Sequence, residues 1–138
     1  MKQLFVLDAC TLIAFFNDEE GADKVEELLR EAKEERFNLT MSKINILEIY
    51  YGIYREMGYE AGEEVLSKIK KLPITIVSKL SDSVFKESGR LKATYRVSLA
   101  DSIAIAEAKV RDAKLVTADH HEFDPLEEKG EVRFFWIR

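Results

Sequence analysis

Leu4-Phe5-Val6-Leu7-Asp8 is a run of four apolar residues that ends in a carboxylate. A continuous apolar run of this length, followed by a second apolar segment at residues 11–16, predicts a strand buried on both faces and then a short helix. An unpaired acid is costly to bury at such a junction. Asp8 is therefore better explained by chemistry than by packing, because ligand sites of open α/β sheets form at the carboxyl ends of strands.

Helix and strand patterns alternate along the rest of the chain. Helices are expected at residues 23–35, 42–57, 60–71, 81–95 and 99–108, and strands at residues 38–41, 74–77, 115–117 and 132–137. This alternation predicts an α/β fold in three layers, with a largely parallel central sheet flanked by helices. Because no repeat or linker interrupts the pattern, residues 1–138 are expected to form a single domain.

The composition restricts the class of protein. Hydrophobic residues make up 46% of the chain and charged residues 34%, as in a soluble protein with its own core. Asp8 interrupts the apolar stretch at residues 4–16, so it does not read as a signal peptide, and no run approaches the roughly 20 apolar residues that span a bilayer. We therefore expect a cytoplasmic protein with no membrane association. The net charge of −5 argues against coating of nucleic acid by electrostatics alone.

Four acids stand where an α/β chain would assemble a metal site: Asp8, Glu48, Asp101 and Asp119. The single cysteine, Cys10, excludes a thiolate zinc site, and oxygen ligands favour Mg²⁺, with Mn²⁺ as a substitute. Two such ions about 3.5–4 Å apart can hold an attacking water and the leaving oxygen of a phosphodiester. The pattern predicts hydrolysis without a covalent intermediate, with Thr117 as a supporting hydroxyl.

Each acid also has a structural explanation. Asp101 lies three residues after Ser98 and can complete a capping box, Glu48 can be a solvated helix residue, and Asp119 can belong to a turn that continues through His120 and His121. Asp8 has the weakest structural explanation, because nothing nearby in the sequence would pair with it.

The helix at residues 42–57 carries more apolar surface than one contact requires. Its isoleucines, tyrosines, leucine and methionine cover well over half of the helical circumference. Such a helix should be buried twice, once against its own core and once against another helix or chain.

In order and surroundings, these acids resemble the PIN domain nucleases, and among them the VapC-type toxins of toxin-antitoxin pairs. The resemblance covers nearly the whole chain. Its matching pieces are residues 6–8 with 12–14, Glu48-Ile49-Tyr50-Tyr51-Gly52, residues 99–104 around Asp101, and Leu115-Val116-Thr117-Ala118-Asp119 with Phe123.

The resemblance implies a Mg²⁺-dependent endoribonuclease that uses Asp8, Glu48, Asp101 and Asp119 as its acidic quartet. It also implies a toxin homodimer and a VapB-like antitoxin that blocks the site. The chain departs from the family at Cys10, where members commonly carry Ser or Asn, and a weaker hydrogen bond there would loosen the hold on the metal.

Other interpretations fit less well. A haloacid-dehalogenase-like phosphatase needs a second Asp two residues after the first, where Cys10 stands, and a phosphorelay receiver needs an acidic pair at the first strand. An RNA-processing PIN nuclease without an antitoxin, or an inactive PIN binding module, remains as an alternative, although the four acids favour activity.

Overall fold

Five parallel strands form a sheet in the order β3-β2-β1-β4-β5 in the computed structural model, which describes residues 2–138. The strands are β1 (Gln3–Leu7), β2 (Phe37–Ser42), β3 (Thr75–Val77), β4 (Lys114–Thr117) and β5 (Phe134–Trp136). Val6 of β1 pairs with Thr40 of β2 on one side and with Leu115 of β4 on the other, so the first strand lies at the centre. Phe5, Val6 and Leu7 are buried as the opening apolar run predicted, whereas Leu4 is exposed.

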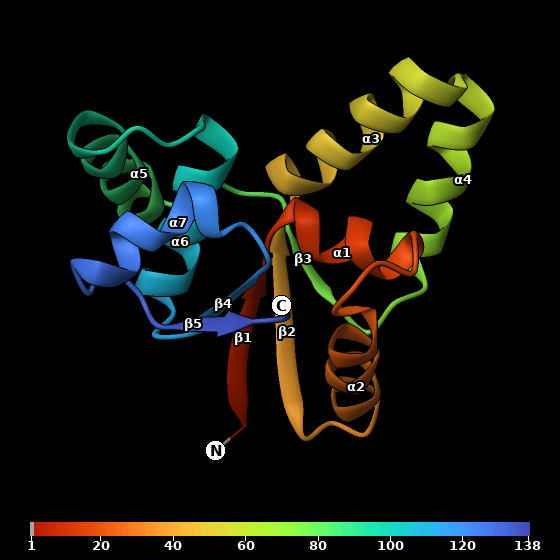
Figure 1. The fold of residues 1–138 in the computed structure, drawn as a ribbon, viewed down its shortest axis with the longest axis horizontal. Helices are drawn as coiled ribbons and strands as arrows, with labels where there is room; N and C mark the ends of the chain where they lie inside the picture. The colour runs from red at the N-terminus through yellow and green to blue at the C-terminus, as the bar shows by residue number, and fades with distance from the viewer. Residues whose placement is uncertain (1) are drawn as a thin grey trace.

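Helices cover both faces of the sheet, as Figure 1 shows. One face carries α1 (Ala9–Phe16), α2 (Ala22–Lys33), α3 (Lys43–Met57) and α4 (Tyr59–Lys70), and the other carries α5 (Asp82–Thr94), α6 (Leu99–Val110) and α7 (His120–Glu128). Side chains of β1 alternate between the two cores: Phe5 and Leu7 pack with α1 and α2, whereas Val6 packs with α6. The three-layer α/β fold is therefore confirmed.

Most predicted boundaries agree with the structure to within a few residues. Ser42 caps α3 and Gly58, with φ of +94°, ends it, as glycine does where the chain turns left-handed. The prediction of a turn at His120 and His121 is wrong, because both residues belong to α7. That helix escaped detection because it buries only Phe123 and Leu126 and contains Pro125, a residue that normally interrupts a helix.

The sheet has a topological switch between β1 and β4. The chain leaves β1 toward β2 on one side, and returns on the other side in β4 and β5. Ligand sites of open α/β sheets form outside the carboxyl ends of the strands at this point, where Asp8 and Asp119 follow β1 and β4. Among residues 2–138, no helix is long and apolar enough to cross a membrane.

Candidate active site

Asp8 is the N-cap of α1 and is almost completely buried. Its Oδ1 accepts the N–H of Thr11 at 3.0 Å, and the Thr11 hydroxyl lies 2.9 Å from the same oxygen. The Cys10 thiol lies 3.2 Å from Oδ1 and 3.3 Å from Oδ2. A thiol is a weak donor, so Thr11 rather than Cys10 provides the stronger fixation of this carboxyl group.

Burial raises the pKa of Asp8 above its ordinary value, and hydrogen bonds from Thr117, Cys10 and Thr11 only partly oppose it. The Thr11 hydroxyl also lies 2.8 Å from the carbonyl oxygen of Val116. One hydroxyl hydrogen cannot serve two acceptors fully. Thr11 therefore divides its hydroxyl between Asp8 and the main chain of β4, while its N–H bonds to Asp8 alone.

Glu48 of α3 and Asp101 of α6 share the electrostatic environment of Asp8. Burial raises the pKa of Glu48, and the negative charge of Asp8 raises it further. Burial also raises the pKa of Asp101 to about 7, with additional contributions from the charges of Asp8, Glu48 and Glu122. These charge interactions put Glu48 of α3 and Asp101 of α6 within electrostatic range of Asp8, which directly follows β1.

Asp119 is connected to this group less directly. It is the N-cap of α7, where its Oδ1 accepts the N–H of Glu122 at 3.1 Å. Its own N–H donates to Thr117 Oγ1 at 3.1 Å, and the buried Thr117 hydroxyl also hydrogen-bonds to Asp8. Thr117 thus links the segments that carry Asp8 and Asp119, as a supporting residue would.

Two further residues, Asn45 and Glu122, belong to the site although they were not predicted from the sequence. Asn45 is completely buried on α3, its Nδ2 donates to the carbonyl oxygen of Ala100 at 3.2 Å, and it also hydrogen-bonds to Glu48. Glu122 Oε1 accepts the N–H of Ser98 at 3.0 Å. Asn45 has no local sequence signal, whereas the Asp119-x-x-Glu122 spacing is that of a helix start and would have indicated α7.

The donor set suits a hard divalent cation. Asp8, Glu48, Asp101 and Asp119 offer only carboxylate oxygens, which Mg²⁺ and Mn²⁺ prefer. Within residues 2–138, no three His, Cys, Asp or Glu side chains lie close enough together to hold an ion as they stand. Coordination by three of these acids would therefore require side-chain rotation. The half-buried Glu48 is well suited to this movement because its side chain is long and flexible.

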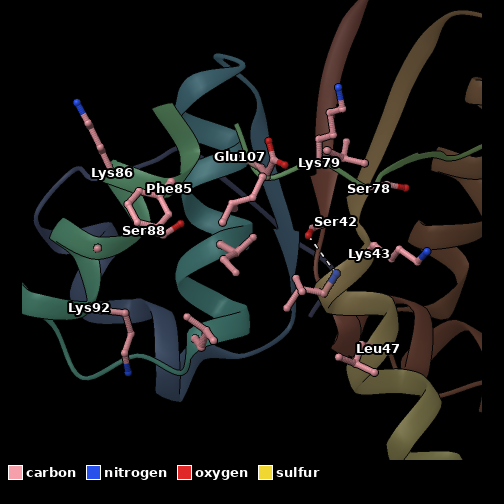
Figure 2. A pocket seen from close by; sticks show the side chains of 16 residues that line it. Ser42, Lys43, Leu47, Ser78, Lys79, Phe85, Lys86, Ser88, Lys92 and Glu107 are labelled. Atoms are coloured by element: carbon pink, nitrogen blue, oxygen red, sulfur yellow. Dashed lines mark hydrogen bonds between the residues drawn. The ribbon is translucent and has the colours of Figure 1, made fainter. Parts of the chain in front are cut away.

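A hollow of about 780 Å³ lies elsewhere. It is a groove between the start of α3, residues 77–80, and the helices α5 and α6, and none of the four acids lines it. Figure 2 shows Phe85 and Ser88 on one wall and Lys43 and Leu47 on the other. We call this surface the α3–α5 groove. Because its lining is largely apolar and includes none of the four acids, this groove suits a macromolecular contact rather than the chemistry.

The model of the PIN domain family matches residues 5–129, nearly the whole chain. The chain belongs to the PIN domain family. Two of the candidate acids, Asp8 and Asp119, directly follow β1 and β4 beside the switch point of the sheet. No protein of curated function matches the sequence significantly.

Solved structures share this fold at low sequence identity. A chain of DNA-bound VapBC from Salmonella typhimurium is 20% identical with a TM-score of 0.74, and the match covers 100% of both chains. A chain of VapBC2 from Rickettsia felis, bound to a promoter DNA fragment, is 16% identical with a TM-score of 0.73, over 96% of this chain and 98% of that one. VapC20 from Mycobacterium tuberculosis, described as a Sarcin-Ricin loop cleaving toxin, is 10% identical with a TM-score of 0.60, over 80% and 85%.

Proposed function

We propose that this PIN domain is a Mg²⁺-dependent endoribonuclease, and that it acts in the cytoplasm as the toxin of a VapBC-type toxin-antitoxin pair. The observation that carries the proposal is the coupling of three acids: the charge of Asp8 raises the pKa of Glu48, and the charges of Asp8 and Glu48 both raise the pKa of Asp101. A fold that holds repelling carboxylates together is explained by a cation that neutralises them. Family membership and the fold shared with a toxin described as cleaving the Sarcin-Ricin loop support RNA as the substrate.

Some residues of the site would bind the cation, and others hold those residues in position. Asp8, Glu48, Asp101 and Asp119 would bind Mg²⁺, or Mn²⁺ in its place, and the bound ion would supply a hydroxide-like nucleophile by lowering the pKa of a water. Thr11 fixes one oxygen of Asp8 through its N–H and its hydroxyl. Thr117 keeps the Asp119 backbone beside Asp8. The Cys10 thiol adds weak hydrogen bonds to both oxygens of Asp8.

The test is cleavage of RNA by purified variants. Asp8→Asn preserves the size of the side chain but removes the charge, and we expect a loss of at least about 100-fold, or roughly 2.7 kcal/mol of transition-state stabilisation. Asp23→Asn, an exposed acid on α2, is the matched control and should leave cleavage unchanged. EDTA should abolish the wild-type activity. Near-normal cleavage by Asp8→Asn would contradict the role of the acidic site.

We further propose that a second copy of the chain covers the α3–α5 groove. Phe85 and Leu99 are 64% and 61% exposed beside the hollow, so one surface carries both protruding side chains and a cavity to receive them. An isologous dimer requires this self-complementarity. The lysines of the groove, including Lys43 and Lys86, can lay their apolar stems on the partner and keep their charges in water.

A different apolar surface remains for a VapB-like antitoxin. Tyr51, Tyr54, Met57 and Tyr59 are exposed on the α3–α4 hairpin, which projects beyond the sheet in Figure 1. We assign the antitoxin to this hairpin face, because a patch of this kind marks a contact with a partner and the similar structures are VapBC complexes.

The two surfaces can be separated by mutation. Phe85→Glu should convert a dimer to a monomer in sedimentation and leave antitoxin binding intact. Tyr54→Glu should do the opposite, with the antitoxin taken from the short reading frame next to the gene. If both variants weaken the same interaction, or neither weakens any, the assignment of the surfaces is wrong. Absence of an adjacent antitoxin gene would favour an RNA-processing role.

A further inference from the structure

Glu122 forms hydrogen bonds to the N-terminal ends of both helices at which Asp101 and Asp119 lie. Its main-chain N–H donates to Asp119 Oδ1 at 3.1 Å, and its carboxylate Oε1 accepts the N–H of Ser98 at 3.0 Å. Ser98 in turn caps α6, because its Oγ accepts the N–H of Asp101 at 3.1 Å. A continuous path of three hydrogen bonds therefore connects α7 with the first turn of α6.

The Ser98 N–H is a donor that a helix start must satisfy from outside the helix. In a capping box, the acid three residues after the cap reaches back to this N–H, and here that acid would be Asp101. The Asp101 carboxylate receives the Ser98 hydroxyl, but the N–H goes to Glu122 of α7 instead. Glu122 thus performs the reciprocal half of the capping box in place of Asp101.

This exchange has a consequence for the acidic group. A carboxylate that also accepted the Ser98 N–H would be held at its own helix start by two bonds from Ser98. Because Glu122 accepts that N–H, the Asp101 carboxylate keeps only the Ser98 hydroxyl there, and the charges of Asp8 and Glu48 act on it as well. The negative charge of Glu122 also raises the pKa of Asp101, after burial and the charges of Asp8 and Glu48.

We propose that Glu122 is a positioning residue: it takes the Ser98 N–H so that Asp101 remains available to the acidic site. This inference rests on the proposed function, because an available Asp101 carboxylate matters only if the acids bind a cation. Glu122 itself need not touch the substrate or the metal.

The role of the Glu122 side chain can be tested by measuring Mn²⁺ binding to three variants. Glu122→Ala removes the acceptor, Glu122→Gln retains an acceptor oxygen, and Glu128→Ala removes an exposed acid from the same helix as the control. We expect electron paramagnetic resonance of free Mn²⁺ to show at least tenfold weaker binding by Glu122→Ala. Glu122→Gln should retain most of the affinity, and Glu128→Ala all of it. Wild-type affinity in Glu122→Ala would overturn the proposal.

A measurement without metal separates this proposal from the proposed function. In urea denaturation with EDTA, Asp101→Asn should raise the midpoint in the wild-type background, because it relieves repulsion. In the Glu122→Ala background the increase should shrink or reverse, because Asp101 then caps Ser98. Additive effects would overturn the role of Glu122. If the wild type binds no Mn²⁺, the proposed nuclease function fails, while this cycle still decides whether Glu122 replaces Asp101 as the cap.

Discussion

Replacing Asp101 by asparagine should make the metal-free protein more stable at neutral pH. The pKa of Asp101 is raised from its ordinary value of 3.8 to about 7, by burial first and then by the charges of Asp8, Glu48 and Glu122. Between these two pH values the unfolded chain is ionised at this position and the folded chain is protonated. The folded state therefore binds more protons, and the free energy of unfolding falls as the pH rises toward 7.

The size of the effect follows from the shift. A displacement of about three pH units, at 1.36 kcal/mol per unit, corresponds to about 4 kcal/mol when the pH is above 7. This is an upper limit, since Asp8 and Glu48 titrate together with Asp101 and readjust when it is neutral. We therefore expect Asp101→Asn to raise the free energy of unfolding by about 1–3 kcal/mol at pH 8, and by less at pH 5.

The assay is urea denaturation in EDTA at pH 5 and pH 8. Asp82→Asn is the matched control, because Asp82 lies in the first turn of α5, which also has a serine cap, but is exposed to solvent. The control should lose a few tenths of a kcal/mol through the helix dipole. The reasoning is refuted if Asp101→Asn destabilises the protein as Asp82→Asn does, or if its effect is the same at both pH values.

Three further predictions test the site and its support. Excess Mn²⁺ should raise the melting temperature of the wild type, because a hundredfold excess over the dissociation constant is worth about 2.7 kcal/mol; an equal shift in Asp8→Asn, measured by calorimetry, would count against the site. Asn45→Ala should lower the free energy of unfolding by about 1–3 kcal/mol, because the buried Ala100 carbonyl loses its donor; a change below about 0.5 kcal/mol in urea denaturation would contradict this. Arg90, Lys109 and Tyr95 donate to Glu131 and lower its pKa to about 2. Glu131→Gln should therefore destabilise the protein at pH 7 and less so as the pH falls toward 2, and a pH-independent effect in the same assay would exclude this network.

The sequence predicted the architecture well because its signals are local. The apolar run before Asp8, the serine caps at Ser42 and Ser98, and Gly58 each act on the residues next to them. Strand and helix boundaries therefore agreed closely with the structure. The prediction failed at α7, where two buried side chains and Pro125 leave little periodicity. The packing of Phe123 and Leu126 against the core decides that helix.

The candidate site shows the same division. Asp8 could be selected from the sequence alone, because an acid that closes a buried strand has few structural explanations. The convergence of Asp8 with Glu48 and Asp101 depends on strand order and helix packing. The roles of Asn45 and Glu122 depend on contacts between residues 55 and 24 positions apart, and no local pattern announces such contacts.

The amino-acid order by itself thus determined the layers, the central strand and the presence of acids at strand and helix ends, since periodicity and capping are properties of neighbouring residues. Only the tertiary structure decided which acids repel one another and which hydroxyl fixes Asp8. It also decided that Glu122 rather than Asp101 accepts the Ser98 N–H. Hydrogen bonds and charge interactions act over a few ångströms in space, and only the folded chain sets those distances.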